Sequence, residues 1–496
     1  MRKKIISILL LAIVLSSCTQ EKISKEDDVV DIVWYVLGSE QKDEKIVEDE
    51  INKRLEKEIG VRLDLRMIDA NEYAEKMRFN FSSNNEFDLC YVGYINRYEE
   101  LVPKNLLYPM NDFLDDSELK NEIPDYIWED VKINGEIYAV PNMQTLITQR
   151  NVFVRSDLAK KYNLDLDKVE KTEDLIPFLD AVRDNEPDVY PFDTNSDLTT
   201  FVSNEDYQIC DIFSNISVLD CFDGTLKIVP IYASKTKETA EKLHSWYEKG
   251  YIRKDILSVS NEDYDRQKSK YAVFVNNYKP GGVDETNASK DIAYIEKIIQ
   301  EKPTIVAGSE KMTMTGINAK SKHPKEAFKV IELMNTDKEL YNLAVFGVEG
   351  VHYDKVSDNR ISLKPNSGYL VRSWALGCQF NAYYVGDQNE EDWKKTIQLN
   401  DTAAKSKLFG FNFDISDVEK KVDEVRRVSA KYKKLTQSAA ISTDEYWDEY
   451  MSNLLEAGYD DVYAELKKQL SEFLLKKYPD MWSEVKNSST IFHLED

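Results

Sequence analysis

Histidine and cysteine are scarce in this chain of 496 residues, which contains four of the first and five of the second. The histidines are scattered, and neither an H-E-x-x-H nor a C-x-x-C spacing occurs, so we expect no metal site and no cofactor. The signatures G-x-S-x-G, Walker and G-x-G-x-x-G are missing as well. Nothing in the motif content therefore indicates a catalytic centre.

Basic residues and long apolar runs are also few. The 65 Lys and Arg residues stand against 90 Asp and Glu residues, which leaves a net charge of −25. A surface of that sign repels phosphate backbones and argues against a nucleic-acid partner. After residue 18 no apolar run reaches the about 20 residues that a membrane-spanning helix needs. With 42% hydrophobic and 31% charged residues, the composition is that of a globular protein long enough for two or three domains.

The first eighteen residues contain the order of features typical of a secretory signal. A basic start at residues 2–4 and an apolar run at residues 5–15 lead through two serines to Cys18. A cysteine directly after small residues resembles bacterial lipoprotein signals. The resemblance implies that residues 1–17 are removed, that Cys18 carries the lipid, and that the protein is anchored to the outer face of the cell membrane. The alternative is an ordinary signal peptide with an incidental cysteine.

Folded structure is predicted to start at residue 31, after a polar tether at residues 18–30. A β-rich run at 32–36, apolar residues four apart at 47–59 and alternation at 61–67 predict a strand, a helix and a strand. Short connections make these two strands parallel neighbours. A helix and a strand extend the sheet over 71–81 and 88–92.

Later segments continue the α/β pattern and then change to helix. Strands are predicted at 151–154, 270–275, 302–308 and 314–318. A helix with proline in its first turn is predicted from His323, with a buried stripe at Ala327, Val330, Ile331 and Met334. After about residue 400 strand signals are few and helical spacing dominates. Cys210 and Cys221 either close a small loop or stay unpaired.

Six segments occur in a fixed order along the chain: IVWYVLGS, FDLCYVG, LLYPMNDFLDD, INGEIYAVPN, NVFVRSDLAKKY and TGINAKSKHPKEAFKVIELMNTDKELYNL. In that order they resemble the extracellular solute-binding lipoproteins of bacterial ABC importers. The tail, with GFNFDISDVEKKVDEVRRVSAKY, resembles the helical C-terminal domain of one subgroup of these lipoproteins. Together the segments span nearly all of the mature chain.

The resemblance implies an α/β architecture of the type II periplasmic-binding-protein kind, with two lobes, strands that cross between them and a helical C-terminal region. Residues 31–150 and 307–352 are expected in lobe 1, residues 151–306 and 353–400 in lobe 2, and residues 401–496 in the helical domain. The implied function is capture of an oligosaccharide in the cleft and delivery to ABC permease subunits, by a monomer that performs no chemistry. A surface-anchored glycoside hydrolase and a lipoprotein that presents its ligand to a sensor are the alternatives.

A sugar has hydroxyl groups at its edge and an apolar C–H face, so its site needs aromatic platforms and planar hydrogen-bonding side chains. The richest stretch is 374–384, which combines a Trp, two amides and two Tyr, and its W-x-x-G-x-Q-F pattern resembles the late cleft segment of the family. Other candidates lie at predicted strand ends, where a core role is the alternative for each aromatic residue. The ten candidates are Trp34, Ser39, Tyr91, Tyr94, Asn142, Gln144, Trp374, Gln379, Asn381 and Tyr383.

Overall fold

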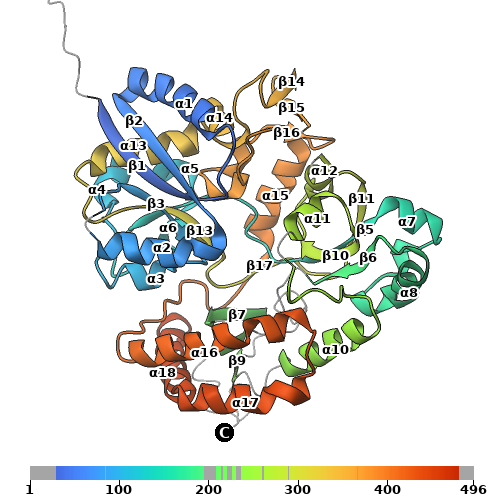
Figure 1. Ribbon diagram of the computed structural model, residues 1–496. Helices are drawn as coiled ribbons and strands as arrows, with labels where there is room; N and C mark the ends of the chain where they lie inside the picture. The colour runs from blue at the N-terminus through green and yellow to red at the C-terminus, as the bar shows by residue number, and fades with distance from the viewer. Residues whose placement is uncertain are drawn as a thin grey trace, which may run out of the picture.

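The computed structural model contains two α/β lobes and a helical C-terminal domain (Figure 1). It describes residues 29–83, 85–194, 208–213, 216–220, 226–230, 236–259, 262–288, 290–365 and 367–479. Cys18 and Cys221 fall outside these ranges, and with them the predicted lipid site and the question of a Cys210–Cys221 pair. Within the same ranges, no helix combines the length and the apolar character that crossing a membrane requires.

Lobe 1 is built on a five-stranded sheet in the order β2-β1-β3-β13-β4. Its first elements are β1 (Val30–Leu37), α1 (Glu44–Ile59), β2 (Val61–Ile68), α2 (Ala70–Ser82) and β3 (Leu89–Gly93). β1 pairs in parallel with β2 and with β3, and α1 ends at Gly60, which has a φ of 68°. The predicted strands and helices in this segment are thereby confirmed. The sheet is completed by β4 (Ala139–Pro141) and β13 (Thr313–Ile317), both added antiparallel to their neighbours.

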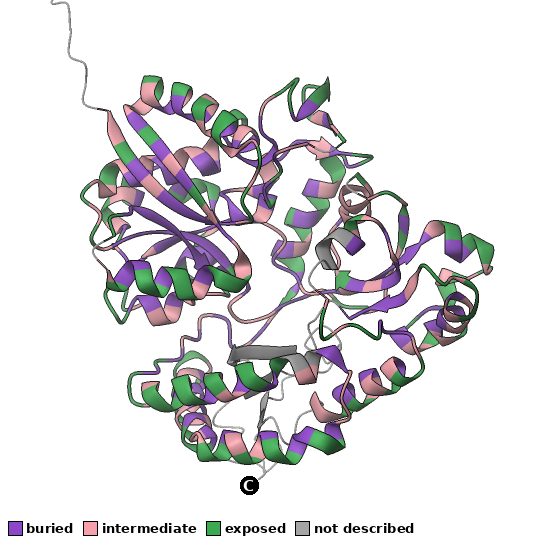
Figure 2. Ribbon diagram, viewed as in Figure 1, coloured by how far each residue is buried: buried purple, intermediate pink, exposed green. Residues whose placement is uncertain are grey.

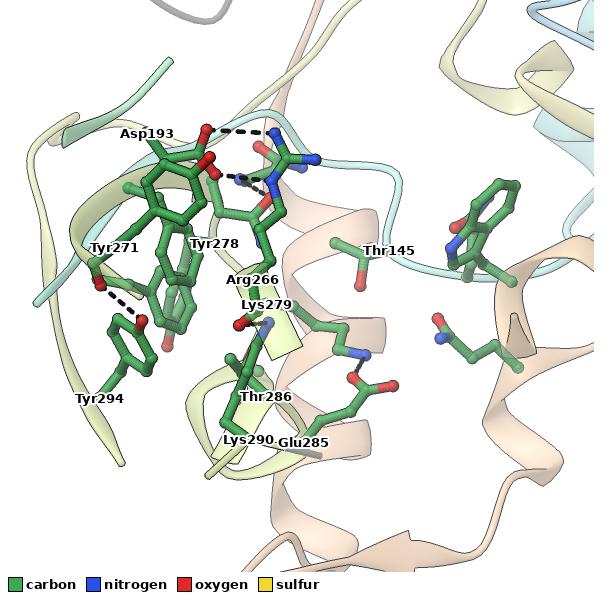
Figure 3. Close-up of a pocket in the computed structure, with 18 residues that line it drawn as sticks. Thr145, Asp193, Arg266, Tyr271, Tyr278, Lys279, Glu285, Thr286, Lys290 and Tyr294 are labelled. Atoms are coloured by element: carbon green, nitrogen blue, oxygen red, sulfur yellow. Dashed lines mark hydrogen bonds and ion pairs between the residues drawn. The ribbon is translucent and has the colours of Figure 1, made fainter. Parts of the chain in front are cut away.

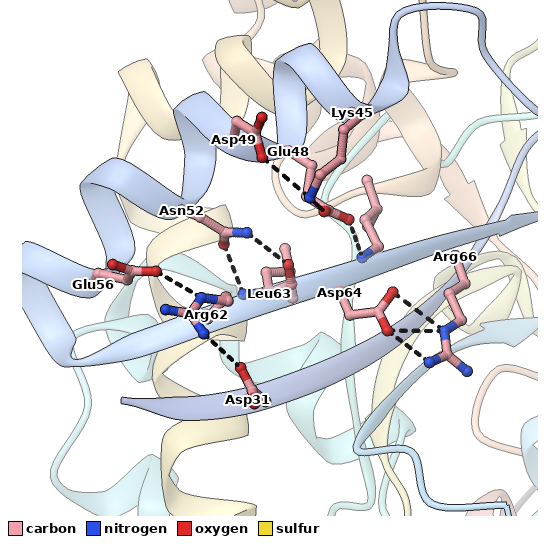
Figure 4. Close-up of polar contacts among 11 residues, drawn as sticks. Asp31, Lys45, Glu48, Asp49, Asn52, Glu56, Arg62, Leu63, Asp64 and Arg66 are labelled. Atoms are coloured by element: carbon pink, nitrogen blue, oxygen red, sulfur yellow. Dashed lines mark hydrogen bonds and ion pairs between the residues drawn. The ribbon is translucent and has the colours of Figure 1, made fainter. Parts of the chain in front are cut away.

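The edge strand β2 has its outer backbone groups satisfied by side chains of α1 (Figure 4). The Asn52 amide accepts a hydrogen bond from the Leu63 N–H at 2.7 Å and donates one to the Leu63 carbonyl at 2.9 Å. Glu48 accepts a hydrogen bond from the Leu65 N–H at 3.0 Å. These bonds fix the helix on the strand and occupy an edge that would otherwise be open to pairing with another chain.

Further helices belong to lobe 1, and three short strands form a separate small sheet in the order β14-β15-β16. They are α3 (Tyr98–Leu101), α4 (Asn111–Asp115), α5 (Leu119–Glu122), α6 (Asp125–Asp130), α13 (Pro324–Thr336), α14 (Lys338–Phe346), β14 (Tyr353–Ser357), β15 (Arg360–Leu363), β16 (Tyr384–Val385) and α15 (Glu390–Thr402). The buried stripe predicted for α13 is confirmed, because Ala327, Val330, Ile331 and Met334 are all buried. Its proline occupies the first turn, where the missing N–H costs no hydrogen bond.

Lobe 2 has a four-stranded sheet in the order β11-β5-β10-β6. Valines of β5 and β10 face a core covered by helices, and the residues between them face the opposite side of the sheet. The lobe contains β5 (Arg150–Arg155), α7 (Ser156–Lys161), α8 (Ile176–Asn185), β6 (Tyr190–Asp193), α10 (Thr236–Glu248), α11 (Glu262–Gln267), β10 (Tyr271–Asn277), α12 (Gly282–Ala288) and β11 (Tyr294–Ile298). A separate sheet consists of β7 (Gln208–Phe213), β8 (Ile216–Asp220) and β9 (Leu226–Pro230).

Three segments pass side by side where the lobes meet. Thr148 exchanges backbone hydrogen bonds with Thr304, and β12 (Thr304–Ile305) pairs in parallel with β17 (Ala404–Lys405). The strand predicted at 302–308 is thus only two residues long. Through these segments the chain connects lobe 1, lobe 2 and the C-terminal domain.

The segment 353–400 packs on lobe 1, which differs from the expected division of the chain. Tyr353, Ile361, Tyr369 and Trp393 belong to the same hydrophobic core as the lobe 1 sheet. The Tyr369 hydroxyl donates a hydrogen bond to the Ala344 carbonyl of α14 at 2.7 Å. Residues 353–400 therefore extend lobe 1, because their apolar side chains complete the surface of α13 and α14.

The C-terminal domain is helical, as predicted, and consists of α16 (Glu419–Ser438), α17 (Thr443–Glu456) and α18 (Tyr459–Lys477). The three helices share a hydrophobic core of their own, and their outer faces are exposed (Figure 2). The domain contacts lobe 1 through an ion pair between Lys104 and Glu419, and lobe 2 through Ala439, which lies in the core of that lobe. It therefore touches both lobes.

Candidate ligand-binding site

A cavity of about 530 Å³ lies between the two lobes (Figure 3). Strands β5, β10 and β11 and helix α12 of lobe 2 form most of its wall. The connection between the lobes contributes Gln144 and Thr145, and lobe 1 contributes Trp374 and Gln379. The volume lies in the range of small-molecule sites, roughly 300–1,000 Å³.

A row of four side chains crosses the face of the lobe 2 sheet that borders the cavity. The strand register places Asp193 beside Phe274, Phe274 beside Phe153, and Phe153 beside Glu296. The two phenyl rings are stacked, with centroids 4.7 Å apart and planes at 7°. The row thus has an apolar centre with a carboxyl group at each end.

The two carboxylates that line the cavity are each held by a cation. Arg266 donates to both oxygens of Asp193, with Nε at 2.7 Å and Nη2 at 3.2 Å. Lys279 of the β10–α12 connection forms an ion pair with Glu285 of α12 (Figure 3). Both pairs are charge-assisted hydrogen bonds, which fix the side chains in place.

Glu296 at the far end of the row is held differently. Its Oε2 accepts a hydrogen bond of 2.6 Å from the amide of Asn151, a fully buried residue of β5. Burial raises the pKa of Glu296 to about 7; the Asn151 bond opposes this rise and the nearby Asp284 adds to it. This carboxyl therefore changes its protonation in the neutral range.

Short polar groups from the connection between the lobes also face the cavity. The Thr145 hydroxyl is buried and has no hydrogen-bond partner among the residues that the structure describes. The Gln144 amide nitrogen donates to the Thr313 hydroxyl at 2.7 Å. A buried hydroxyl without a partner is energetically costly, so a ligand that bonds to Thr145 would relieve that cost.

Trp374 supplies the aromatic surface of the lobe 1 wall. It lies in the short 3-10 helix η5 (Ser373–Ala375), with the Arg372 guanidinium 5.6 Å from its ring centroid and the Tyr94 ring at 6.5 Å. The next turn requires Gly377, because its φ is 48° and a Cβ would lie 2.2 Å from the Met334 carbonyl oxygen. The close approach to α13 sets the position of this wall.

The structure brings together some of the ten candidates predicted from the sequence. Gln144, Trp374 and Gln379 line the cavity. Tyr94 lies beside Trp374 and is 43% exposed, although it is not part of the cavity lining.

The other candidates lie away from the cavity. Trp34 and Tyr91 are each 1% exposed in the lobe 1 core, and the Tyr91 hydroxyl donates to the Met312 carbonyl at 2.8 Å. Tyr383 is buried in the same core. The rings of Trp34 and Tyr91 face into the lobe because β1 and β3 lie in the middle of a covered sheet and have no free face.

Three polar candidates hold backbone or surface positions. Asn142 donates to the Ala375 carbonyl at 3.0 Å and Asn381 donates to the Asn335 carbonyl at 2.7 Å. The exposed Ser39 hydroxyl donates to the Asp69 carboxylate at 3.0 Å. The Asn142 bond supports the loop that carries Trp374, so this residue stabilises the cavity wall from outside it.

Most of the lobe 2 wall was not among the candidates. The missed residues of this wall are Phe153, Asp193, Arg266, Tyr271, Phe274, Asn276, Asn277, Tyr278, Lys279, Gly282, Glu285, Thr286, Lys290 and Tyr294. The sequence held one signal for two of them. In RNVFVR and YAVFVNN a single phenylalanine stands between valines, and period-2 alternation places it on the face opposite the valine core.

Two α/β lobes joined by crossing segments, with a ligand-sized cavity between them, define a solute-binding protein. Residues 38–340 match the family described as bacterial extracellular solute-binding protein, and residues 407–475 match a domain of unknown function, DUF3502. The first match covers more than half of the chain, so this protein belongs to the bacterial extracellular solute-binding protein family. The family and the fold inferred from the short sequence segments are confirmed.

Known proteins are similar to this chain over nearly its full length, in sequence and in structure. A carbohydrate ABC transporter substrate-binding protein of Streptococcus pneumoniae serotype 4 is 27% identical, over 95% of this chain and 97% of its own. The polygalacturonan/rhamnogalacturonan-binding protein YtcQ of Bacillus subtilis is 20% identical, over 93% and 98%. The crystal structure of the N-glycan transport solute-binding protein NgtS of Streptococcus pneumoniae with Man1GlcNAc superposes with a TM-score of 0.77 at 23% identity, over 90% and 99%.

Proposed function

We propose that this protein captures an oligosaccharide in the cavity between its lobes and delivers it to an ABC permease. The observation that carries the proposal is the composition of the cavity wall. Trp374 of lobe 1 and Phe274 and Tyr278 of lobe 2 offer apolar ring surfaces, while Thr145 and Gln144 offer hydrogen-bonding groups. Sugars present an apolar C–H face and hydroxyl edges, and this wall has groups suited to each.

The relatives support the same substrate class. The pneumococcal relative is named a carbohydrate ABC transporter substrate-binding protein, and the solved structure of NgtS contains Man1GlcNAc. The signal pattern that ends at Cys18 supports a lipid anchor on the outer face of the membrane, from which a monomer meets its permease.

Binding is proposed to occur without cleavage. A glycoside hydrolase needs one carboxylic acid that can donate a proton and a second carboxylate across the scissile bond. Both carboxylates of the cavity wall, Asp193 and Glu285, are already held in ion pairs, with Arg266 and with Lys279 respectively. Glu296, whose pKa is raised, is not among the residues that line the cavity.

Calorimetry of the mature protein against a panel of oligosaccharides tests the proposal. We expect saturable binding of at least one oligosaccharide and no new reducing ends after prolonged incubation. Binding of a peptide, with no binding of any sugar, would overturn the substrate class. New reducing ends would favour the hydrolase, and normal uptake of the bound sugar in cells that lack the protein would favour a role in signalling.

A further inference from the structure

We infer that the ligand is an uncharged oligosaccharide and that the cavity selects against acidic sugars, because the cations in its wall are already engaged. This inference rests on the proposed function and concerns the same cavity. Acidic oligosaccharides, such as chains of uronic acids, carry one carboxylate on each sugar, and a site that accepts them needs cations that are available to those carboxylates.

Arg266 is the cation best suited to a carboxylate, and the edge of its guanidinium formed by Nε and Nη2 is already occupied by one. Its Nε and Nη2 form the two-pronged contact with Asp193, whose side chain is only 4% exposed. If a uronate displaced Asp193 from the guanidinium, a buried carboxylate would lose its charge partner. Removing one partner of a buried ion pair is strongly unfavourable, so exchange of Asp193 for a ligand carboxylate is opposed.

The two lysines of the wall are also engaged. The Lys279 ammonium is paired with Glu285 and lies 5.2 Å from the centroid of the Trp393 ring. The Lys290 ammonium donates to the backbone carbonyl of Arg266 at 2.8 Å. Arg372 lies outside the cavity lining and its guanidinium covers the Trp374 ring, where it contributes a cation–π contact to the lobe 1 wall.

The row across the lobe 2 sheet adds a second argument. A sugar stacked on the Phe274 and Phe153 rings would lie beside the carboxyl group of Asp193, which lines the same cavity. A uronate in that position would bring a second carboxylate next to Asp193, which is unfavourable in a partly desolvated site. A neutral sugar meets no such repulsion, and its hydroxyl groups can donate to carboxylate oxygens.

The decisive experiment is calorimetry at constant salt and pH 7.5 with matched pairs of oligosaccharides. Each pair has the same length and linkage and differs in the oxidation of the sugar, for example galactose against galacturonic acid and mannose against mannuronic acid. We expect a neutral oligosaccharide to bind at least tenfold more tightly than its acidic counterpart. Tighter binding of an acidic member would overturn the inference and leave the proposed function standing, whereas binding of neither class in any pair would overturn both.

Two variants test the cause of the selection. Asp193→Asn removes the carboxylate that occupies Nε and Nη2 of Arg266, and Glu285→Gln removes the carboxylate paired with Lys279. Each is expected to raise the affinity for the acidic member at least tenfold relative to the neutral one. The matched control is Asp184→Asn, which removes one carboxylate from an equally two-pronged pair with Arg183 (2.7 and 3.1 Å) outside the cavity lining. An unchanged preference in both cavity variants would overturn the inference, and Glu285→Gln suffices if Asp193→Asn does not fold.

Discussion

Arg426 of α16 donates hydrogen bonds to both carboxylate oxygens of Glu100 on α3, with its Nη1 2.9 Å from Oε2. This contact attaches the C-terminal domain to lobe 1. Ala439 follows the C-terminal end of α16 and contacts lobe 2. Its backbone carbonyl lies 2.8 Å from Nδ1 of His244, and its side chain packs in the lobe 2 core. A change in the relative position of the lobes must therefore be absorbed within the C-terminal domain or at its contacts with the lobes, of which these are two.

The variant Arg426→Gln is expected to loosen the attachment to lobe 1. The pair is partly buried, with side chains 28% and 18% exposed, so its loss is expected to cost about 1 kcal/mol in free energy of unfolding. Hydrogen exchange measured by mass spectrometry should become faster in α3 and in the first half of α16. The rest of the lobe 1 sheet should keep its protection.

The neighbouring arginine provides the control. Arg427 is 76% exposed, and its ion pair among the residues that the structure describes is a local one, with Glu424 of the same helix. Arg427→Gln should change the free energy of unfolding by less than about 0.5 kcal/mol and leave exchange in α3 unaltered. Equal effects of the two variants would show that the Arg426–Glu100 contact does not hold the domains together.

Trp374→Ala is expected to weaken oligosaccharide binding at least about tenfold, because the indole is the largest apolar surface of the lobe 1 wall. The loss should be seen in the dissociation constant measured by calorimetry, with little change in thermal midpoint, since the side chain is only partly buried. Phe79→Ala removes an aromatic ring of lobe 1 that is 65% exposed and outside the cavity lining. If both variants bind equally well, Trp374 is not a platform for the ligand.

The strands and helices of lobe 1 could be predicted because their signals are local. The alternation in 61–67 and the four-residue spacing in α1 are set by which face of each element is buried, and Gly60 marks the end of the helix. The helical character of the C-terminal domain was visible for the same reason. The place of residues 353–400 was not, since a segment with few regular elements takes its position from the α13 and α14 surfaces on which it packs.

The cavity was predicted in part, and more successfully for lobe 1 than for lobe 2. Trp374 and Gln379 stood out because aromatic and amide residues cluster within one short stretch. Trp34 and Tyr91 lie near the ends of their strands, as predicted, but their side chains are buried in the core. The position of a residue along a strand does not by itself decide whether its side chain faces the core or the ligand. The Arg266–Asp193 pair joins residues 73 apart in sequence, which only the tertiary fold brings together.

Glu296→Gln is expected to change how stability depends on pH. The pKa of Glu296 is raised from 4.5 to about 7 in the folded protein. The folded state therefore keeps a proton that the unfolded chain has lost, and the stability associated with that proton disappears as the pH rises from 4.5 through about 7. Glutamine keeps the acceptor for Asn151 and cannot ionise.

Thermal midpoints recorded between pH 4.5 and 8 test this expectation. The variant should match the native protein at the acid end and become progressively more stable than it toward pH 7. Glu301→Gln offers a control, because Glu301 is an exposed glutamate that follows the same strand. A difference between Glu296→Gln and the native protein that does not vary with pH would contradict the assignment.

A buried group of charges joins lobe 1 to the C-terminal domain. Asp130 of α6, Glu310 and Lys311 are each less than a tenth exposed, and Lys477 of α18 donates to the Phe409 carbonyl beside them. Burial raises the pKa of Asp130 well above its usual range, the adjacent Glu310 carboxyl raises it further, and Lys311 and Lys477 oppose the rise. We therefore expect Asp130 to be protonated at neutral pH.

Asp130→Asn should consequently be tolerated. The folded protein holds the Asp130 proton above pH 3.8, where the unfolded chain releases it, so this carboxyl lowers stability increasingly as the pH rises. The asparagine variant should equal the native protein near pH 4 and exceed it at pH 8 in thermal midpoint. Glu129 is exposed and directly precedes Asp130 in the chain. Glu129→Gln should show no pH-dependent difference in thermal midpoint from the native protein. If Asp130→Asn instead lost stability as the pH rose, Asp130 would be ionised and would serve as the counter-charge of Lys311.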